Sequence, residues 1–418
     1  MNVKRILSLV TIASLVLAVG LVSPRHSVAA DVITIKQWYH QYGEEGTQQA
    51  VLRYADEYMK LNPNIKIEVT WVPGDYEAKL AAALLTNDGP DVFERPGVDT
   101  AIVAAKQAAP LDDLFTDEVK KDFGQTITEN TVGGKIYGVK MIIDTTVLYY
   151  RKSMLDKAGV KPPTTMDELI DAVKKLGTGK VKSIFLGNDA IGLQAPMLVW
   201  SAGGDYIRDG KVAFNTDAVA TVYAKSAELS KLPGVLVGAP TDWWDPSAFT
   251  DGQVAIQHCG LWAMPAIQKA LGDDFGVLPW PALNADQKPS VLMGGWSELV
   301  NAKSQHVAEA KAFLKWQWIE NITIQQDWSL NYGFHLPPRA SAAASADKLK
   351  TGPAADVVKF VTSYGHLQRY PYWTTAMESA LNDSLANVVK KGADPKTELQ
   401  AAAAKIQKEY DDLMGTGK

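Results

Sequence analysis

The chain has 418 residues, of which 46% are hydrophobic and 21% are charged, and its formal net charge is −5 at pH 7. This composition is ordinary for a soluble globular protein and excludes a largely disordered chain. The length exceeds what a single hydrophobic core usually organises, so we expect two domains. An acidic chain of this size is poorly suited to nucleic acid or to an anionic membrane surface, so we expect neither nucleic-acid binding nor membrane insertion.

Residues 1–30 have the pattern of a signal peptide. Lys4 and Arg5 precede an apolar run from Ile6 to Val22, and small residues just before Asp31 offer a cleavage site. A lipid-anchored exported protein would carry a cysteine at that site, but Cys259 is the only cysteine of the chain. The sequence therefore predicts an exported periplasmic protein with a cleaved signal peptide, no lipid anchor and no intrachain disulfide.

The first stretch beyond this segment, Ile33–Gly46, predicts a strand that leads into a helix. Ile33 and Ile35 alternate with polar neighbours, and aromatic and amide side chains follow at positions 38–42. In α/β proteins, a strand that ends in such side chains before a helix is a common place for a ligand. Aromatic residues that merely close the edge of the sheet would produce the same pattern, so this stretch alone leaves both interpretations open.

The next elements alternate between strand and helix. A helical face through Tyr58 is followed by a strand at Ile65–Val72, a second helix around Leu80 and a short strand at 91–94. This order is typical of a mostly parallel sheet flanked by helices. The run from Ile136 to Tyr150 is too long for one strand of a compact domain, so we expect it to cross between domains near Asp144.

The second half predicts further helices and short strands. Thr165 and Glu168 form a capping box at the start of a helix. A strand at 253–259 leads into Gly260-Leu-Trp262, and the last third is mostly helical, with Asp394-Pro395 as a cap and first-turn proline.

Catalytic and metal signatures are missing from the sequence. It contains no G-x-S-x-G, H-E-x-x-H, G-x-x-x-x-G-K or EF-hand motif, and its six histidines do not cluster. We therefore expect no cofactor, no metal site and no enzymatic activity.

Aromatic residues recur in the loops between regular elements. An indole can stack on the apolar face of a sugar ring while neighbouring polar side chains bind the hydroxyl rim. Taken singly, each of these aromatics is more often part of the core, and we assign Trp316, Trp318 and Trp328 to it. For the aromatics that follow strands beside a glycine, core and ligand contact stay equally open. The loop aromatics are Trp38–Tyr42, Trp200, Trp243, Trp244, Trp262, Trp296, Tyr372 and Trp373.

Several segments resemble one known family. They are Asp88-Gly-Pro-Asp-Val92, Leu148-Tyr-Tyr-Arg-Lys-Ser153, Pro163-Thr-Thr-Met-Asp-Glu-Leu169, Phe249-Thr-Asp-Gly-Gln-Val-Ala-Ile256 with Gly260-Leu-Trp262, and Gly333-Phe-His-Leu-Pro-Pro-Arg339. In order and spacing the chain resembles the extracellular solute-binding proteins of ABC sugar importers, the family that includes maltodextrin-binding proteins. The likeness extends over essentially all of residues 31–418.

The resemblance implies a two-lobed periplasmic-binding-protein fold, in which each lobe is a mostly parallel sheet flanked by helices and a hinge of several crossings joins the lobes. It assigns 31–144 and 294–335 to the N-terminal lobe and 145–293 and 336–418 to the C-terminal lobe. It places the ligand between the lobes. The ligand-binding residues carried over by position are His40, Gln41, Tyr42, Glu44, Glu94, Arg95, Asp144, Thr145, Trp243, Trp244, Trp262, Gly295, Trp296 and Trp373.

The implied function is a monomeric periplasmic receptor that delivers a sugar to the membrane subunits of an ABC importer. Glu94, Arg95, Gln194 and Met197 stand where maltodextrin-binding members carry further aromatics, which favours a small sugar or glycoside over a long α-glucan. Two alternatives stay open from the sequence. One is a ferric-ion or other solute receptor that uses Tyr149 or Tyr150 as a ligand, and the other is a secreted glycosidase.

Overall fold

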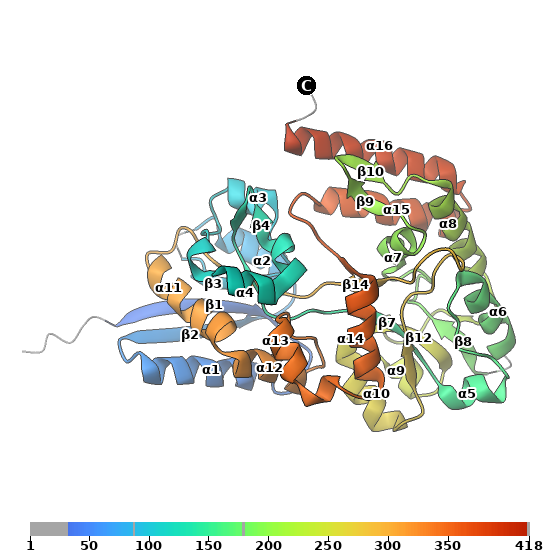
Figure 1. Cartoon of the computed structure of the whole chain (residues 1–418), viewed down its shortest axis with the longest axis horizontal. Helices are drawn as coiled ribbons and strands as arrows, with labels where there is room; N and C mark the ends of the chain where they lie inside the picture. The colour runs from blue at the N-terminus through green and yellow to red at the C-terminus, as the bar shows by residue number, and fades with distance from the viewer. Residues whose placement is uncertain (1–31, 87, 178–179, 416–418) are drawn as a thin grey trace, which may run out of the picture.

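The computed structural model describes residues 32–86, 88–177 and 180–415. The expected signal peptide at 1–30 lies outside these residues. Two α/β lobes lie side by side, the N-terminal lobe on the left and the C-terminal lobe on the right in Figure 1, and extended segments run between them. The fold predicted from the sequence is confirmed.

The N-terminal lobe is built on a five-stranded sheet in the order β2-β1-β3-β15-β6. β1 pairs in parallel with β2 and β3, whereas β15 runs antiparallel to both β3 and β6. One strand therefore runs against the other four. The strands are β1 (Ile33–His40), β2 (Ile65–Val72), β3 (Val92–Arg95), β6 (Val139–Lys140) and β15 (Ser297–Val300).

Helices cover this sheet because their apolar faces pack against it. On α1, Ala50, Val51, Tyr54 and Tyr58 are buried, which is the helical face expected from the sequence. Trp318 and Trp328 are fully buried in the same core, and Trp316 packs against it. The helices are α1 (Thr47–Leu61), α2 (Tyr76–Ala83), α3 (Thr100–Ala104), α4 (Asp117–Phe123), α11 (Val307–Leu314), the π-helix η4 (Lys315–Glu320) and α12 (Ile322–Asn331), with the 3-10 turns η1 (Asp112–Leu114) and η2 (Gly124–Asn130) and the hairpin β4 (Thr131–Val132) and β5 (Lys135–Ile136).

The C-terminal lobe repeats this plan with the order β11-β8-β12-β7-β13. β8 pairs in parallel with β11 and β12, and β7 is the one strand that runs the other way. In both lobes the reversed strand, β7 or β15, directly follows a segment that crosses from the other lobe. The strands are β7 (Thr146–Tyr150), β8 (Lys182–Phe185), β11 (Val235–Leu236), β12 (Val254–Gly260) and β13 (Gly276–Leu278).

Local sequence signals explain where helices of this lobe begin. Thr165 and Glu168 form the predicted capping box of α6, and Asp394 caps α16 with Pro395 in its first turn. The remaining elements are α5 (Lys152–Lys157), α6 (Met166–Leu176), α7 (Gln194–Ser201), β9 (Asp205–Arg208), β10 (Lys211–Ala213), α8 (Asp217–Ser230), α9 (Ser247–Thr250), η3 (Leu261–Ala263), α10 (Met264–Leu271), β14 (Val291–Met293), α13 (Ala340–Ser345), η5 (Asp347–Leu349), α14 (Gly352–Tyr364), β16 (Gly365–Leu367), α15 (Thr375–Lys391) and α16 (Pro395–Met414).

Three crossing segments form the hinge, and backbone hydrogen bonds tie them together. Asp144 N–H donates to Gly294 O at 3.3 Å, and Gly294 N–H donates to Asp144 O at 2.7 Å. On the other side, Ile143 and Leu336 exchange bonds of 2.8 and 3.0 Å. The run from Ile136 to Tyr150 thus splits into β6, a crossing and β7, as its length suggested, and the first crossing lies between the other two.

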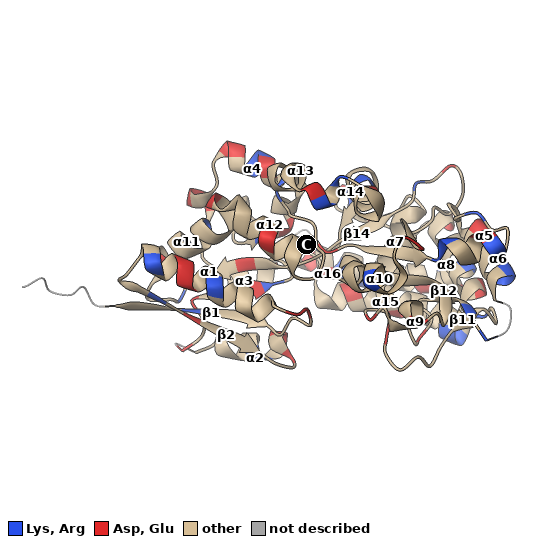
Figure 2. Cartoon of the chain, turned by 90° about the horizontal axis from the view of Figure 1, so that it is seen from below, with Lys and Arg blue, Asp and Glu red and all other residues tan. Residues whose placement is uncertain are grey.

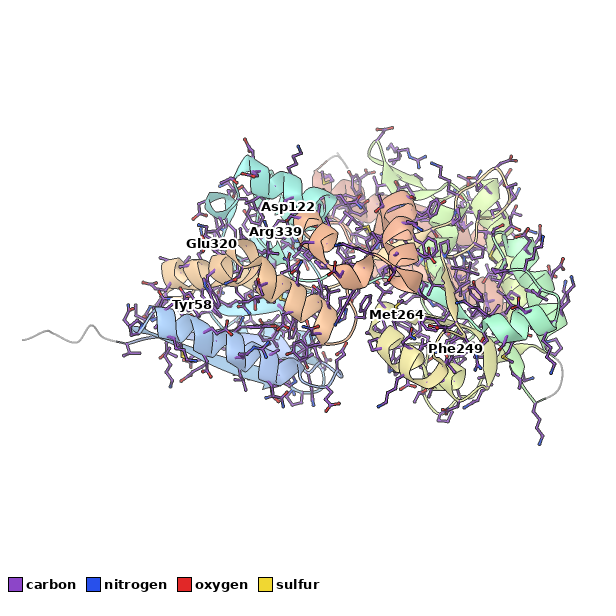
Figure 3. The ribbon with its side chains drawn as sticks, turned by 60° about the horizontal axis from the view of Figure 1, so that its bottom comes forward. Tyr58, Asp122, Phe249, Met264, Glu320 and Arg339 are labelled. Atoms are coloured by element: carbon purple, nitrogen blue, oxygen red, sulfur yellow. The ribbon has the colours of Figure 1, made fainter. Side chains whose placement is uncertain are left out.

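Next to the hinge, α13 contacts α4 and α12 of the N-terminal lobe. The guanidinium of Arg339 donates to Asp122 Oδ2 at 2.7 Å, and Figure 3 shows these two side chains beside each other. We predicted that residues 336–345 belong to the C-terminal lobe, but α13 packs on helices of the N-terminal lobe, so this boundary stays a prediction.

Charged residues lie mostly on helices and loops, with Lys and Arg prominent on α5 and α6 (Figure 2). Within the described ranges, no helix is both long and apolar enough to cross a bilayer.

Candidate functional site

A cavity of about 410 Å³ lies between the lobes beside the hinge. Its lining comes from the end of β1 and the start of β15 in one lobe, from the loops around α9 and η3 in the other, and from the crossings. We call it the cleft. The residues that line it are His40, Tyr42, Gly43, Glu44, Asp144, Trp244, Asp245, Pro246, Trp262, Ala263, Ala266, Trp296 and His335.

The wall from the N-terminal lobe is organised by a buried carboxylate. Glu94 is fully buried on β3, accepts a hydrogen bond from Tyr42 Oη at 2.8 Å and lies 2.5 Å from His40 Nδ1. It also accepts the backbone N–H of His40. The His40 ring stacks on Trp296 with centroids 4.1 Å apart. These bonds fix the ring of His40 while leaving about a fifth of its side chain exposed toward the cleft.

The wall from the C-terminal lobe presents two indoles. Trp262 Nε1 donates to the backbone oxygen of Trp244 at 2.9 Å, so the two residues hold each other in place. Trp244 is 52% exposed, so a large part of its ring is open to solvent or to a ligand. Beside them, Asp245 accepts hydrogen bonds from Ser247 N–H at 2.8 Å and from Thr241 Oγ1 at 3.2 Å.

The crossings contribute an acid–imidazole pair at the floor of the cleft. Nδ1 of His335 is hydrogen-bonded to Asp144 Oδ1, and its Nε2 lies 3.7 Å from Glu44 Oε1. Burial alone would lower the pKa of His335, but the Asp144 carboxylate and then Glu44 outweigh it and raise the pKa above its usual value. Burial opposes ionisation of Asp144, yet the imidazolium lowers its pKa. Both shifts favour the ionised form of the pair.

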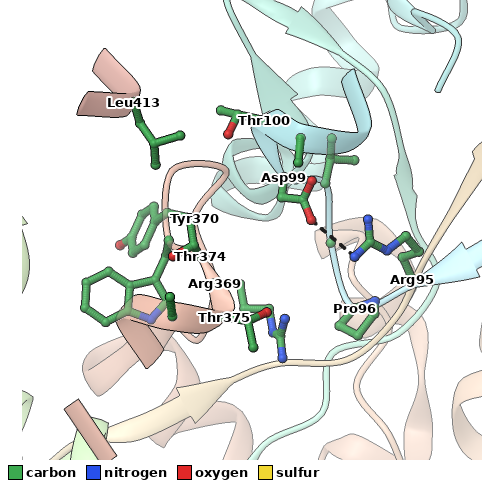
Figure 4. Close-up of a pocket in the computed structure, with 14 residues that line it drawn as sticks. Arg95, Pro96, Asp99, Thr100, Arg369, Tyr370, Thr374, Thr375 and Leu413 are labelled. Carbon is green, nitrogen blue, oxygen red and sulfur yellow. Dashed lines mark ion pairs between the residues drawn. The ribbon is translucent and has the colours of Figure 1, made fainter. Parts of the chain in front are cut away.

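A second cavity, of about 300 Å³, also has walls from both lobes (Figure 4). We call it the arginine cavity, because Arg95 and Arg369 line it. Arg95 is paired with Asp99 at 3.2 Å and Glu77 at 3.4 Å, and the first of these ion pairs is drawn in Figure 4. Its lining residues are Arg95, Pro96, Gly97, Val98, Asp99, Thr100, Ala101, Arg369, Tyr370, Trp373, Thr374, Thr375, Ala376 and Leu413.

The lobes touch at the arginine cavity. The backbone N–H of Thr100, at the start of α3, donates to Pro371 O at 3.0 Å. Pro371 belongs to the loop that leads from β16 to α15, so this bond joins the two lobes directly.

The structure brings part of the predicted ligand-binding set to the cleft. The residues that line it are His40, Tyr42, Glu44, Asp144, Trp244, Trp262 and Trp296. Arg95 and Trp373 line the arginine cavity instead, and Trp373 is mostly covered by the Tyr206 ring, with centroids 3.9 Å apart. Arg95 and Glu94 separate because successive residues of a strand point to opposite faces.

The other predicted residues line neither cavity, each for a local reason. Glu94 and Thr145 are fully buried, and Gln41 points to solvent. Trp243 packs edge-on against Trp262 and stacks on His258. The backbone of Gly295, with φ +98°, sits too close to Ile142 and Asp144 for any side chain. Glu94 and Thr145 lie beneath the wall of the cleft, and their role as direct ligand contacts stays a prediction.

Two polar residues that line the cleft, His335 and Asp245, were not among the predicted ligand contacts. His335 lies in Gly333–Arg339, a segment recognised as a crossing, and Asp245 lies in the aromatic loop 241–246. A histidine inside a crossing segment is a detectable signal, because crossings border the space between lobes. No sequence pattern marks Arg369 as a cavity residue, because only the folded chain places it opposite Arg95.

Comparison with known proteins agrees with this architecture. The arabinooligosaccharide-binding protein of Bacillus subtilis is 26% identical over 299 residues, which cover 67% of each chain. The multiple sugar-binding protein of Streptococcus mutans is 22% identical over 332 residues, covering 74% of this chain and 77% of that protein. The GacH receptor of Streptomyces glaucescens, solved unliganded and with acarbose, superposes with a TM-score of 0.73 at 25% identity, covering 92% and 99% of the two chains.

The family model described as bacterial extracellular solute-binding protein matches residues 53–357. This range includes most of both sheets, all three crossings and most of the residues that line the cleft. The chain belongs to the bacterial extracellular solute-binding protein family.

Proposed function

We propose that this protein is the periplasmic receptor of an ABC importer and that it captures a small sugar or glycoside in the cleft. One observation carries the proposal: indoles from both lobes, Trp296 on one side and Trp244 and Trp262 on the other, line the same cavity as the carboxylates of Glu44 and Asp144. Aromatic faces suit the C–H faces of a sugar ring, and carboxylates accept hydrogen bonds from its hydroxyls. The sugar ligands named for its relatives support this class.

The volume of the cleft favours a small ligand. At about 410 Å³ the cavity is near the lower end of ordinary ligand sites. We therefore infer a mono- or disaccharide-sized ligand.

Binding is coupled to movement of the lobes about the three crossings. A ligand that touches both walls binds a closed arrangement better than an open one, and so shifts the population toward closure. The closed receptor, acting as a monomer, then presents surfaces of both lobes to the membrane subunits of the importer.

Tryptophan fluorescence and calorimetry across a panel of neutral mono- and disaccharides test this proposal. Three indoles line the cleft, so at least one sugar is expected to change the emission and to bind with measurable heat. Trp244→Ala removes an exposed ring, so it should leave the fold intact and weaken that sugar roughly tenfold or more.

Trp316→Ala is the matched control, because Trp316 packs on Tyr58 in the N-terminal lobe and lines neither cavity. It should leave the affinity unchanged. If the wild-type protein binds no sugar of this panel and no amino sugar, the proposed function is contradicted.

The alternative of a ferric receptor finds no support in the fold. Tyr149 is fully buried and donates to Gly260 O at 3.0 Å, and Tyr150, which follows it on β7, packs against the core of the C-terminal lobe. The described residues contain no group of three or more His, Cys, Asp or Glu placed to hold a metal ion.

A further inference from the structure

The charged side chains that line the cleft are all acidic except for its two histidines. Glu44, Asp144 and Asp245 contribute carboxylates, and no Lys or Arg lines this cavity. The guanidinium groups of Arg95 and Arg369 lie in the arginine cavity, where they are already paired with Glu77, Asp99 and Glu378. The cleft therefore holds three carboxylates, and His335 is the basic side chain of its lining that pairs with any of them.

Two of the three carboxylates already have partners. Asp144 is paired with His335, and Asp245 accepts hydrogen bonds from Ser247 and Thr241. Glu44 differs, since its carboxylate makes no hydrogen bond within the described residues and its nearest charged neighbour, His335 Nε2, is 3.7 Å away. Its side chain rests against the crossing, where a Cβ on Gly333 would lie 2.5 Å from Glu44 Cγ.

A second, independent feature points to a ligand at this place. His335 is only 3% exposed, its Nδ1 is held by Asp144, and its Nε2 faces the cleft without a hydrogen-bond partner in the described part of the chain. This nitrogen is therefore open to a ligand group in the cleft, beside the Glu44 carboxylate. Glu44 Oε1 and His335 Nε2 thus form an acceptor and a donor, 3.7 Å apart, on one wall.

Building on the proposed function, we propose that the bound glycoside carries a cationic nitrogen, and that Glu44 pairs with this ammonium while His335 Nε2 donates to an adjacent ligand oxygen. A vicinal amino alcohol, as in a 2-amino sugar, presents these two groups side by side. The indoles also favour a 2-amino sugar, because an ammonium over the face of Trp244 or Trp262 is attracted by the π electrons of the ring. A uronic acid would instead place its carboxylate opposite Glu44 and Asp245.

The test compares each sugar with forms that are modified at one position and carry a different charge. Glucose, galactose and mannose are titrated beside their 2-amino, 2-acetamido and uronic-acid forms by calorimetry at low salt and at pH 6.5. We expect at least one 2-amino sugar to bind tenfold or more tightly than its neutral parent and its acetamido form, which keeps the nitrogen but not the charge. The uronic acids should show no measurable binding, and added salt should weaken only the amino sugar.

Glu44→Gln keeps the size of the side chain and removes its charge, so the amino sugar should then bind no more tightly than its neutral parent. Glu45→Gln removes the same charge from the next, exposed residue, which does not line the cleft, and should change nothing.

The outcomes separate this inference from the proposed function. Neutral sugars that bind as tightly as their amino forms, or a Glu44→Gln variant that keeps the preference, would overturn the inference and leave the sugar receptor intact. Failure of both neutral and amino sugars to bind would overturn both. Binding of a polyamine such as putrescine without any sugar would also overturn both, because the ligand would then be a cation but no glycoside.

Discussion

At the scale of single residues, burial sets the chemistry of the cleft and its surroundings. His258, on β12 behind Trp243, is 1% exposed, and neither of its ring nitrogens has a hydrogen-bond partner within the described residues. Burial lowers its pKa to about 4. The folded protein therefore holds this ring neutral over a pH range in which the unfolded chain binds a proton.

This difference predicts acid sensitivity with a definite sign. Below about pH 6.5 the unfolded state gains a proton at position 258 that the folded state does not, so stability falls as the pH drops toward 4. His258→Phe removes the titrating group and should recover about 3 kcal/mol relative to wild type between pH 7 and pH 4. Urea unfolding at several pH values measures this, and parallel pH profiles for the two proteins would contradict it.

The residue scale also shows where sequence reasoning stops. The sequence predicts that Glu94 lies at the end of a strand, but it does not predict that this side chain is fully buried. The burial arises because His40 and Tyr42, at the end of β1 and just beyond it, cover the carboxylate. The same limit applies to His335 and Arg369. Each reaches a cavity only because distant segments meet, and no local pattern encodes that meeting.

At the scale of elements, the sequence predicts a strand or a helix start correctly where the pattern lies within a few neighbouring residues. The alternation in Ile65–Val72 matches β2 from end to end, and the capping box at Thr165 starts α6. The hinge is different, since its three crossings come from positions near 143, 294 and 336. Gly295, with φ +98°, lets the second crossing pass within contact distance of the first, where a Cβ would lie 2.8 Å from Asp144 N.

Gly295→Ala should therefore be strongly destabilising. A side chain there combines a strained backbone with a collision against main-chain atoms that cannot move alone, for which we expect a loss of about 2–4 kcal/mol. Gly392→Ala is the matched control, because Gly392 has a similar φ of +68° at the end of α15 but open space around it. It should cost only about 1 kcal/mol by thermal or urea unfolding, and equal losses in the two variants would contradict a steric role for Gly295.

At the scale of the whole molecule, two lobes with similar sheets enclose a cleft whose walls belong to different parts of the chain. Tyr42 and Trp296 come from one lobe and Trp262 from the other, while Asp144 and His335 lie on the crossings between them. A ligand that contacts all three parts is held only when the lobes are closed around it. This arrangement links recognition to a change of shape that a partner in the membrane can detect.

A crystal structure with the tightest-binding sugar from the panel tests this account most directly. We expect the sugar ring between Trp296 and the pair Trp244 and Trp262, in contact with Glu44 and His335, and both lobes should touch it. A sugar bound to one lobe only, or seated in the arginine cavity with the cleft empty, would contradict the central claim that this cleft is the site of recognition.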